Sequence, residues 1–497
     1  MNSHKNYCIF LLLFFSWLFL EAQNNNDPLN LLNNEIELLK KDPCLKNASW
    51  SVMVSETATG KQLCGYNVDM VLEPASVMKI VTTGAALSLL GSSFVFETRL
   101  EYSGTIDPEG NLIGNLYITG GGDPTIGSKR FDGAVSTDSI FYEFYRALKQ
   151  NNIRHIKGSV VADASFFEEN PAAGSWLWED IGNYYASGAY GLNINENSYR
   201  IYFDAGVDLG SPALLNIKDP ELNEMEFINN VKTGKAGSGD NVIIYGSPYT
   251  NVRMLEGTVP VGKTNFDVDG SLTDPPAYFA KLFSEYIYNK GIIADSATKT
   301  NRKIKWEGKT DSVKRKILAL HKSPELKEIV VPTNTKSVNL FAEAILKTIG
   351  RIKKDKGSET AGVEAVKNFW ASKNIDLKGF EMEDGCGLSR KNKISTRQLC
   401  EMLKILTKEK AYTDFSQSLP LAGKTGGMAA MLKGTIAENN LRAKTGNMDK
   451  IKSYAGYVKN ISGKNLCFAL VFNNYTCSNS ELKPKIEKLL LLIAQTK

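Results

Sequence analysis

Histidine is nearly absent from this chain: the 497 residues include three, His4, His155 and His321. His4 lies in the N-terminal leader discussed next, which leaves two histidines for any functional site. A Ser-His-Asp hydrolase needs a histidine beside its serine, and the sequence contains no G-x-S-x-G elbow to present such a serine. Metal centres built on histidine pairs are disfavoured for the same reason. We therefore expect no metal ion and no cofactor, and a chemistry that does not depend on imidazole.

Long apolar runs are lacking everywhere except at the N-terminus. Lys5 precedes the almost wholly apolar segment Cys8–Leu20, and Ala22 completes a plausible small-residue cleavage site. Residues 1–22 are therefore predicted to be a secretory signal peptide. An uncleaved anchor is the alternative, although the run is short for a membrane span. We predict an exported, periplasmic protein and leave an association with the membrane open.

Paired cysteine motifs are missing as well. No C-x-x-C spacing occurs, so the cysteines indicate neither a metal site nor a redox motif. Six of the seven cysteines remain after the leader, and export would permit disulfides. Cys44 and Cys64 flank a predicted β-hairpin, and they are our first expectation for a disulfide pair.

Nucleic acids and nucleotides are both disfavoured as partners. The net charge of +5 is mild and spread along the chain, unlike the basic surface of a nucleic-acid-binding protein. Gly257–Thr264 matches the phosphate-loop pattern G-x-x-x-x-G-K-[ST] literally. Such a loop needs a helix that begins at its lysine, but Asn265–Gly270 alternates like a strand followed by a turn. We therefore predict that Gly257–Thr264 does not bind phosphate.

The order of the predicted elements indicates one discontinuous domain that carries an insertion. Trp50–Ser55 and Gln62–Tyr66 resemble two strands of a hairpin. From about residue 96 to residue 306 the residue pattern predicts mostly β-strands, separated by many turn-forming residues. Predicted strands there are Leu116–Thr119, Val160–Ala162, Ile201–Phe203 and Val242–Tyr245. Helical patterns return at Pro276–Lys290, Val338–Ile349, Ala361–Lys373 and Thr396–Lys408. The chain ends with a predicted strand, Asn465–Asn473, and a predicted helix, Glu481–Gln495.

The most informative motif is the S-x-x-K formed by Ser76 and Lys79. Pro74 ahead of it, and the apolar run Ile80–Leu90 that ends at Gly91, predict a helix that begins just before the serine. Ser76 would then lie in the first turn, where free N–H groups and the helix dipole favour negative charge. Lys79 would share its face one turn later. A serine with a neighbouring amine can form an acyl-enzyme without histidine.

Two partner motifs follow in a consistent order. Ser337 and Asn339 form an S-x-N sequence before a predicted helix. K-T-G occurs three times, beginning at Lys232, Lys424 and Lys444. The first precedes Ser337 in the chain and the second lies in a loop, whereas Lys444 is soon followed by a predicted strand. The set S-x-x-K, S-x-N and K-T-G is the signature of β-lactamases and penicillin-binding proteins.

With these motifs, the chain resembles the D-alanyl-D-alanine carboxypeptidase/endopeptidase family, the class C low-molecular-mass penicillin-binding proteins. The resemblance covers nearly all of the chain after the leader. Further stretches that carry it are Gly122–Thr125, Trp176–Asp180 with Tyr185, His321–Pro324, and Asp384–Arg390, in which Cys386 replaces a serine. Gly426–Met428 departs from the usual D-G-T after the second K-T-G sequence.

The resemblance implies a fold and a domain plan. We expect the α/β (α+β) penicillin-recognising serine-transferase fold, an antiparallel sheet flanked by helices, with inserted β-rich domains. Residues 27–95 and 311–497 would form the discontinuous, transpeptidase-like catalytic domain. Residues 96–165 and 241–310 would form inserted domain II, and residues 166–240 inserted domain III.

The resemblance also implies a role for each motif residue. Ser76 would attack the carbonyl of a D-Ala-D-Ala peptide bond, with neutral Lys79 as its base and Ser337 relaying a proton to the leaving amine. Burial and the like charge of Lys444 would lower the pKa of Lys79. The expected substrate-binding residues are Asn339, Lys444, Thr445, Gly446 and Asn447. The backbone N–H groups of Ser76 and Asn447 would form the oxyanion hole.

Two other functions remain open at this point. A β-lactamase or esterase can use the same fold, although such enzymes usually lack a large insertion. A non-catalytic cell-wall-binding protein is the alternative from another class, and the complete motif set argues against it. Expected partners are peptidoglycan peptides and β-lactams. The sequence leaves open carboxypeptidase against endopeptidase use, the role of the insertion, a dimer, and whether Lys79 alone is the base.

Overall fold

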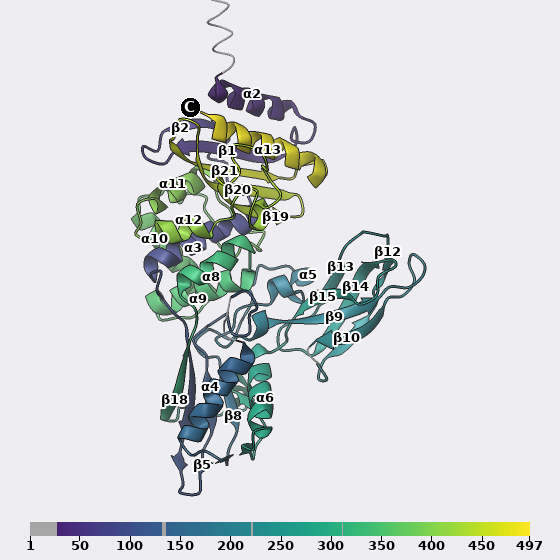
Figure 1. The fold of residues 1–497 in the computed structure, drawn as a ribbon, viewed down its shortest axis with the longest axis vertical. Helices are drawn as coiled ribbons and strands as arrows, with labels where there is room; N and C mark the ends of the chain where they lie inside the picture. The colour runs from purple at the N-terminus through teal and green to yellow at the C-terminus, as the bar shows by residue number, and fades with distance from the viewer. Residues whose placement is uncertain (1–26, 132–135, 220–221, 311) are drawn as a thin grey trace, which may run out of the picture.

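Figure 1 shows a computed structural model of the chain, which describes residues 27–131, 136–219, 222–310 and 312–497. The predicted signal peptide lies outside the described residues. A compact body contains the first and the last described helices, and two arms extend from it (Figure 1). Both arms belong to residues 97–322, which we call the insertion.

The body is built on one antiparallel sheet that joins the two ends of the chain. The strand order is β19-β20-β21-β1-β2, so the N-terminal hairpin pairs with the C-terminal strands. The strands are β1 (Ser49–Glu56), β2 (Gln62–Tyr66), β19 (Arg442–Met448), β20 (Ile451–Lys459) and β21 (Asn465–Asn473). β21 matches its predicted range, and β1 and β2 confirm the predicted hairpin.

Helices cover both faces of this sheet. One face packs against α2 (Pro28–Lys41) and α13 (Asn479–Gln495). On the other face, α11 (Thr396–Leu406) contacts β1 and β21, and α3 (Met78–Leu89) shares one apolar core with α11 and the sheet. Four further helices pack around α3: α8 (Leu326–Thr335), α9 (Asn339–Lys354), α10 (Glu359–Ser372) and α12 (Tyr412–Ser418). β21 shows the alternation this requires: Leu466 and Phe468 lie in the core with α2 and α13, and Cys467 and Ala469 in the core with α3. This agrees with the expected antiparallel sheet flanked by helices.

The helix predicted after Pro74 begins later than expected. A short 3₁₀ turn, η1 (Ala75–Val77), comes first and contains Ser76. Ala75 has φ 47°, a left-handed conformation that non-glycine residues rarely adopt. α3 then runs to Leu89, two residues before Gly91. The serine therefore lies at a strained entry to the helix rather than in its first regular turn.

The lower arm in Figure 1 consists of two mixed sheets with α4 (Thr137–Gln150) and α6 (Pro275–Tyr288) packed against them. Its larger sheet has the order β17-β8-β6-β3-β18. These strands are β3 (Glu97–Ser103), β6 (Leu116–Thr119), β8 (Val160–Asp163), β17 (Lys299–Thr300) and β18 (Arg315–Lys322). The smaller sheet contains β4 (Thr105–Ile106), β5 (Asn111–Ile113), β7 (His155–Ile156) and β16 (Ile293–Ala294), and α7 (Asn301–Trp306) follows β17.

The side arm contains the remaining strands of the insertion. They are β9 (Ser198–Asp204), β10 (Leu214–Asp219), β11 (Glu226–Asn229), β12 (Lys232–Gly234), β13 (Asn241–Tyr245), β14 (Val252–Pro260) and β15 (Phe266–Ser271). β14 pairs with β11, β12 and β13, and β15 pairs with β9. Strand pairing thus groups residues 241–271 with the side arm, whereas the predicted domain plan places residues 241–310 in domain II. The domain limits remain a prediction.

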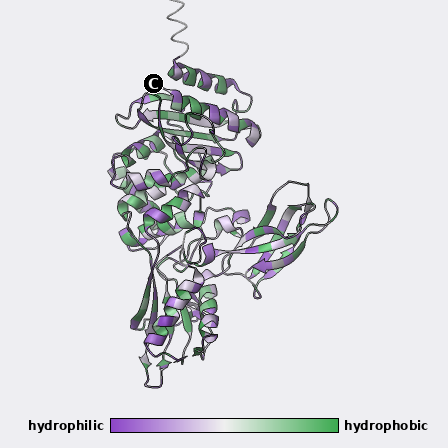
Figure 2. Ribbon diagram, viewed as in Figure 1, coloured by the Kyte–Doolittle hydropathy of each residue, from purple (hydrophilic) through white to green (hydrophobic). Residues whose placement is uncertain are grey.

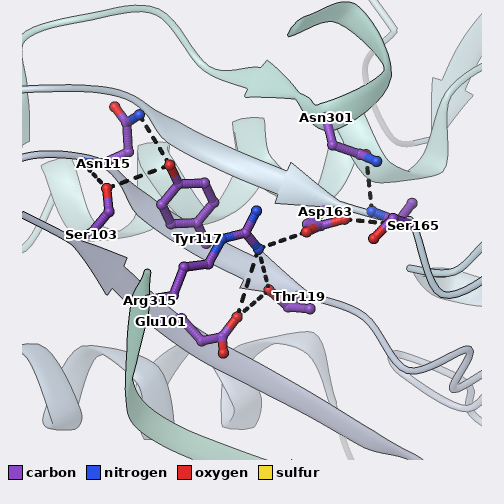
Figure 3. A network of polar contacts seen from close by, with 10 residues as sticks. Glu101, Ser103, Asn115, Tyr117, Thr119, Asp163, Ser165, Asn301 and Arg315 are labelled. Atoms are coloured by element: carbon purple, nitrogen blue, oxygen red, sulfur yellow. Dashed lines mark hydrogen bonds and ion pairs between the residues drawn. The ribbon is translucent and has the colours of Figure 1, made fainter. Parts of the chain in front are cut away.

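A polar network fixes the strand that returns from the insertion to the body (Figure 3). The Arg315 guanidinium on β18 donates hydrogen bonds to Asp163 at 2.6 Å and to Thr119 Oγ1 at 3.2 Å. It also lies 3.8 Å from Glu101 and 3.9 Å from the ring centre of Tyr117. Because these partners lie on β3, β6 and β8, one arginine links the return strand to three strands of the lower arm.

Apolar residues, green in Figure 2, occur both in the body and in the insertion, which has a core of its own between its sheets and α4 and α6. Within the part of the chain that the structure describes, no helix combines the length and the apolar character required to cross a membrane. The rejected phosphate loop, Gly257–Thr264, runs from the end of β14 into a turn before β15. No helix begins at Lys263, as the alternation of Asn265–Gly270 predicts, and the absence of phosphate binding stays a prediction.

The expected Cys44–Cys64 disulfide is wrong. Cys44 is bonded to Cys477, 433 residues later. Cys44 follows α2, and its carbonyl accepts a hydrogen bond from the Thr476 N–H at 3.1 Å. Cys64 lies on β2 opposite Val54 and is buried and free. The disulfide thus joins the two ends of the chain covalently beside the sheet. Cys477 is far from Cys44 in the sequence but next to it in the fold, whereas Cys64 is closer in the sequence and is not bonded to it.

Candidate functional site

Ser76 and Lys79 lie together, as their spacing predicts. Lys79 is fully buried, and its Nζ is 3.2 Å from Ser76 Oγ. The same nitrogen donates to Asn339 Oδ1 at 2.6 Å and to the Cys386 carbonyl at 2.7 Å. Both of these oxygens can only accept hydrogen bonds. A neutral amine would use its two N–H bonds on them, and its lone pair would face the Ser76 hydroxyl.

Burial is the main influence on the charge of Lys79. It lowers the pKa of this amine below its ordinary value, while Cys386, Asp384 and Glu343 act in the opposite direction. Asp384 is the carboxyl group of this set that accepts hydrogen bonds at both oxygens. Gly387 N and Asn392 Nδ2 donate to its Oδ1, and Ser389 N and Trp176 Nε1 donate to its Oδ2.

Ser337 and Lys444 form a second serine–lysine pair. Lys444 Nζ donates to Ser337 Oγ at 3.0 Å and to the Thr445 carbonyl at 2.7 Å. Ser337 lies in the short connection between α8 and α9. Its backbone has φ 59°, which is a left-handed conformation. Lys444 is 1% exposed. Burial, together with the positive charge of Lys79, lowers the pKa of Lys444 well below its ordinary value.

The K-T-G strand lies at the open edge of the sheet. β19 is paired with β20 along its length, its other edge is bridged among the described residues only near its start, between Arg442 and Leu421, and η1 packs against both β19 and β20. A Cβ on Gly446 would lie 2.6 Å from the Pro74 carbonyl and 2.1 Å from Ser453 Oγ. Only glycine therefore permits this approach of the strand to the turn that holds Ser76. Thr445 is half-buried and Asn447 is exposed.

A cavity of about 560 Å³ opens above these pairs. Ser76, Ser337, Asn339 and Asn447 line it. Other lining residues come from the insertion and from the loop before α11, among them Leu177, Asp180, Tyr184, Tyr185 and Arg390. The site therefore combines all three predicted motifs with a wall that the sequence motifs did not identify.

We call residues 170–198, which supply most of this added wall, the wall segment. Asn339 Nδ2 donates to the Tyr185 carbonyl at 2.8 Å, and Trp176 donates to Asp384 at 2.9 Å. An apolar cluster that includes Trp176, Ala342 and Cys386 joins the segment to α9. The sequence did contain an indication of this wall. The stretches Trp176–Asp180 and Asp384–Arg390 resemble the family, but the resemblance gave their residues no role in the site.

The competing motif matches lie elsewhere. Lys232 begins β12 in the side arm. Lys424 is half-exposed and forms an ion pair with Glu438 at 3.4 Å. Ser480 of a second S-x-x-K sequence is exposed at the start of α13, and Ser372 of a second S-x-N sequence ends α10. None of them lines the cavity above Ser76.

One group of potential metal ligands occurs in the described ranges. Glu343, Asp384 and Cys386 each place one ligand-type atom within 4.8 Å of the others, and all three are buried. Both Asp384 oxygens are already saturated by four N–H donors, and the Lys79 amine is a neighbour. A cation would break those hydrogen bonds and face a lysine, so these residues do not suit a metal ion.

Comparisons with known proteins agree with this geometry. The family model described as the D-Ala-D-Ala carboxypeptidase 3 (S13) family matches residues 32–496. A D-alanyl-D-alanine carboxypeptidase of Actinomadura sp. is 28% identical, over 90% of this chain and 81% of the relative. The D-alanyl-D-alanine carboxypeptidase DacB of Haemophilus influenzae is 25% identical, over 85% of each chain.

The fold is similar to a solved structure. The crystal structure of penicillin binding protein 4 from Haemophilus influenzae aligns with a TM-score of 0.79 and 22% identity, covering 93% of this chain and 99% of that one. The expected penicillin-recognising fold with its insertion is therefore confirmed over nearly the full length. Because the family model matches almost the entire chain, this protein belongs to the D-Ala-D-Ala carboxypeptidase 3 (S13) family.

Proposed function

We propose that this protein is a serine D-Ala-D-Ala carboxypeptidase/endopeptidase that cleaves peptidoglycan stem peptides through an acyl-enzyme on Ser76. The observation that carries the proposal is the 3.2 Å contact between Ser76 Oγ and the fully buried Lys79 amine. Family membership supports the reaction class.

In the acylation step, Lys79 removes the proton of the Ser76 hydroxyl while the oxygen attacks the peptide carbonyl. Burial favours the neutral amine that this step needs, and the bonds to Asn339 and Cys386 leave its lone pair toward the serine. The N–H groups of Ser76 and Asn447 would hold the oxyanion that forms. Water then hydrolyses the acyl-enzyme and regenerates Ser76.

The second pair, Ser337 and Lys444, would act on the leaving-group side of the scissile peptide bond. The Ser337 hydroxyl would pass a proton to the leaving D-Ala amine. Lys444 and Thr445 would bind the terminal carboxylate. Among the described residues, the buried Lys444 amine has no carboxylate as a hydrogen-bond partner, so the substrate would supply the anion that this amine lacks.

The surroundings of the site support a peptide substrate. The cavity holds acidic, basic, aromatic and apolar side chains, which suits a mixed peptide with charged ends. A β-lactam would enter as a mimic of the same D-Ala-D-Ala end. Because Gly257–Thr264 leads from β14 into a turn instead of a helix, we assign no nucleotide to this loop.

We further propose that the protein is exported and works outside the cytoplasm. The Cys44–Cys477 disulfide supports an oxidising compartment, because such bonds are rare in the cytosol. The N-terminal signal pattern supports the same conclusion.

The decisive experiment is Ser76→Ala. We expect it to abolish both release of D-Ala from purified muropeptides and covalent labelling by a fluorescent penicillin, since Ser76 forms the acyl bond. Ser480→Ala is the matched control and should label like the wild type. Normal labelling of Ser76→Ala would refute the assignment, and rapid release of the penicillin by the wild type would indicate a β-lactamase instead.

A further inference from the structure

A cavity of about 440 Å³ lies between the two arms of the insertion, which diverge from each other in Figure 1. The side arm contributes Met225 and Tyr249, and the lower arm contributes Tyr278 on α6 and Trp306 on α7. None of the residues that line this cavity lines the catalytic cavity. Its volume is within the range of ligand-binding pockets, about 300–1,000 Å³.

Trp306 gives this cavity an exposed aromatic surface that is held in place. The side chain is 67% exposed, and the Arg302 guanidinium lies 4.4 Å from its ring centre. Arg302 is itself fixed, because it lies 3.6 Å from the ring centre of Tyr249 and donates a hydrogen bond to Asp274, the N-cap residue of α6. The indole is thus positioned in advance, which lowers the entropy that a ligand must overcome to stack on it.

The cavity also carries unbalanced positive charge. Each of its two lining acids, Glu224 and Asp274, already forms an ion pair with a basic residue. Lys299 and Lys303 line the same cavity, and neither forms an ion pair within the ranges that the structure describes. The charge of both lysines acts on Glu307, but this carboxylate is paired with another lysine at 3.1 Å. An anionic group in the cavity would therefore be attracted by two ammonium groups.

A second cavity, of about 460 Å³, adjoins the first. The two cavities share Tyr249 and Arg302, and the second is also lined by Tyr190 and Gly191 of the wall segment. Together they lead from Trp306 toward the wall segment, and we call them the arm groove. Each cavity alone has the volume of a ligand pocket, so an elongated chain fills the arm groove better than a single small molecule does.

We propose that the arm groove binds a glycan strand of peptidoglycan. This inference rests on the proposed function, which makes peptidoglycan the substrate. The face of a pyranose ring presents C–H bonds, and the negative face of an aromatic ring such as Trp306 attracts them. Lys299 and Lys303 pair with carboxylates that the strand carries on its lactyl groups or on its stem peptides. The groove thereby holds the enzyme on the polymer while Ser76 acts on a stem peptide.

The test is calorimetric binding of peptide-free glycan strands, prepared by amidase digestion of sacculi, to the whole protein. These strands offer Ser76 no peptide bond, so binding is measured apart from catalysis. Trp306→Ala should weaken binding at least tenfold, as loss of an aromatic anchor usually does, and Trp306→Phe should restore most of the affinity. Tyr288→Ala is the matched control, because Tyr288 is 64% exposed at the end of α6 and does not line the cavity. It should bind like the wild type.

The double variant Lys299→Gln with Lys303→Gln tests the charges. It should weaken binding of the peptide-free strands, which carry lactyl carboxylates, and the loss should shrink as the salt concentration rises. A neutral tetramer of N-acetylglucosamine should bind to this variant and to the wild type equally. Strands that retain their stem peptides, measured with Ser76→Ala to prevent cleavage, identify the carboxylate: a smaller loss assigns the lysines to the lactyl group, and an equal or larger loss assigns them to the stem peptide.

The groove should also affect turnover of the polymer. In Trp306→Ala we expect KM for release of D-Ala from intact sacculi to rise, and KM for a soluble pentapeptide to stay at the wild-type value. A residue that merely supports the fold would change both.

Three results would overturn the proposal. They are failure of the wild type to bind peptide-free strands, equal binding by Trp306→Ala, and binding of sugar-free stem peptides that is lost in Trp306→Ala, which would make the groove a peptide site. Failure of the proposed function would be distinct. Ser76→Ala would then label with penicillin like the wild type, and the glycan strands would still bind in the groove.

Discussion

Ser76 with Lys79, and Ser337 with Lys444, are two serine–lysine pairs at nearly equal oxygen–nitrogen distances, 3.2 and 3.0 Å. Both amines are buried. Their surroundings differ in charge: Lys79 has Asp384 and Glu343 nearby, whereas the charged group acting on Lys444 is the cation Lys79.

This difference assigns different tasks to two similar pairs. Two buried ammonium groups repel each other, so the empty site disfavours carrying both charges. A substrate carboxylate beside Lys444 would restore the charge on that amine, and repulsion would then favour neutral Lys79. Binding of the substrate would thus prepare the base that attacks it.

The strongest test of this comparison is Lys79→Met. It removes the amine that we propose accepts the Ser76 proton, and it keeps a side chain of similar length in a buried position. We expect acylation by penicillin to fall by roughly 10²–10⁴-fold, the usual range for a lost general base. Stopped-flow or gel labelling would measure it. A rate close to that of the wild type would show that another group acts as the base.

Lys444→Ala should have a smaller effect of a different kind. Loss of a charged hydrogen bond to the substrate carboxylate should raise KM by roughly 10–100-fold, equivalent to about 1.5–3 kcal/mol. An amide analogue without the carboxylate should be much less affected. Lys424→Ala, at the other downstream K-T-G sequence, is the matched control and should retain the wild-type KM.

The pH dependence of KM sharpens the same prediction. Burial lowers the pKa of Lys444, so its charge is lost at a lower pH than that of an ordinary lysine. Carboxylate binding should therefore weaken as the pH rises through that lowered pKa, and KM should increase. In Lys444→Ala this increase should disappear. Its persistence would locate the titrating group elsewhere.

The smallest effect on either pair is expected from removing the disulfide. Cys44→Ala with Cys477→Ala should lower the free energy of unfolding by about 2–5 kcal/mol, because the bond closes a very long loop. Thermal unfolding measures this loss. Acylation below the unfolding transition should not change, since the disulfide lies outside the cavity. A large kinetic effect would show that the pairs depend on distant parts of the body.

Features set by neighbouring residues were predictable from the sequence. The strand Asn465–Asn473 and the helix predicted over Thr396–Lys408 were found because alternation and capping act within a few residues. The three motifs also led to Ser76 and Ser337, which line one cavity, and to Lys444, which is bonded to Ser337. Their catalytic roles remain predictions.

Features set by tertiary contacts were not predictable. The 3₁₀ turn at Ser76 and the left-handed φ of Ser337 depend on the residues that surround them in the fold. Glu343 has the sequence context of an ordinary helical residue, and only the fold buries it within 4.8 Å of Asp384 and Cys386. The disulfide prediction failed for the same reason, since Cys477 approaches Cys44 only after β21 joins β1.

The insertion leaves and re-enters the body at one place. Phe96 N donates to Ser323 Oγ at 2.9 Å, and Ser323 N donates to the Phe96 carbonyl at 3.0 Å. The two ends of the body that flank the insertion therefore lie next to each other, and a short linker could join them if residues 97–322 were deleted. Such a deletion would also remove the partners that Asn339, Lys347 and Asp384 have on the wall segment. The insertion is thus dispensable for the continuity of the body but not for the support of the site.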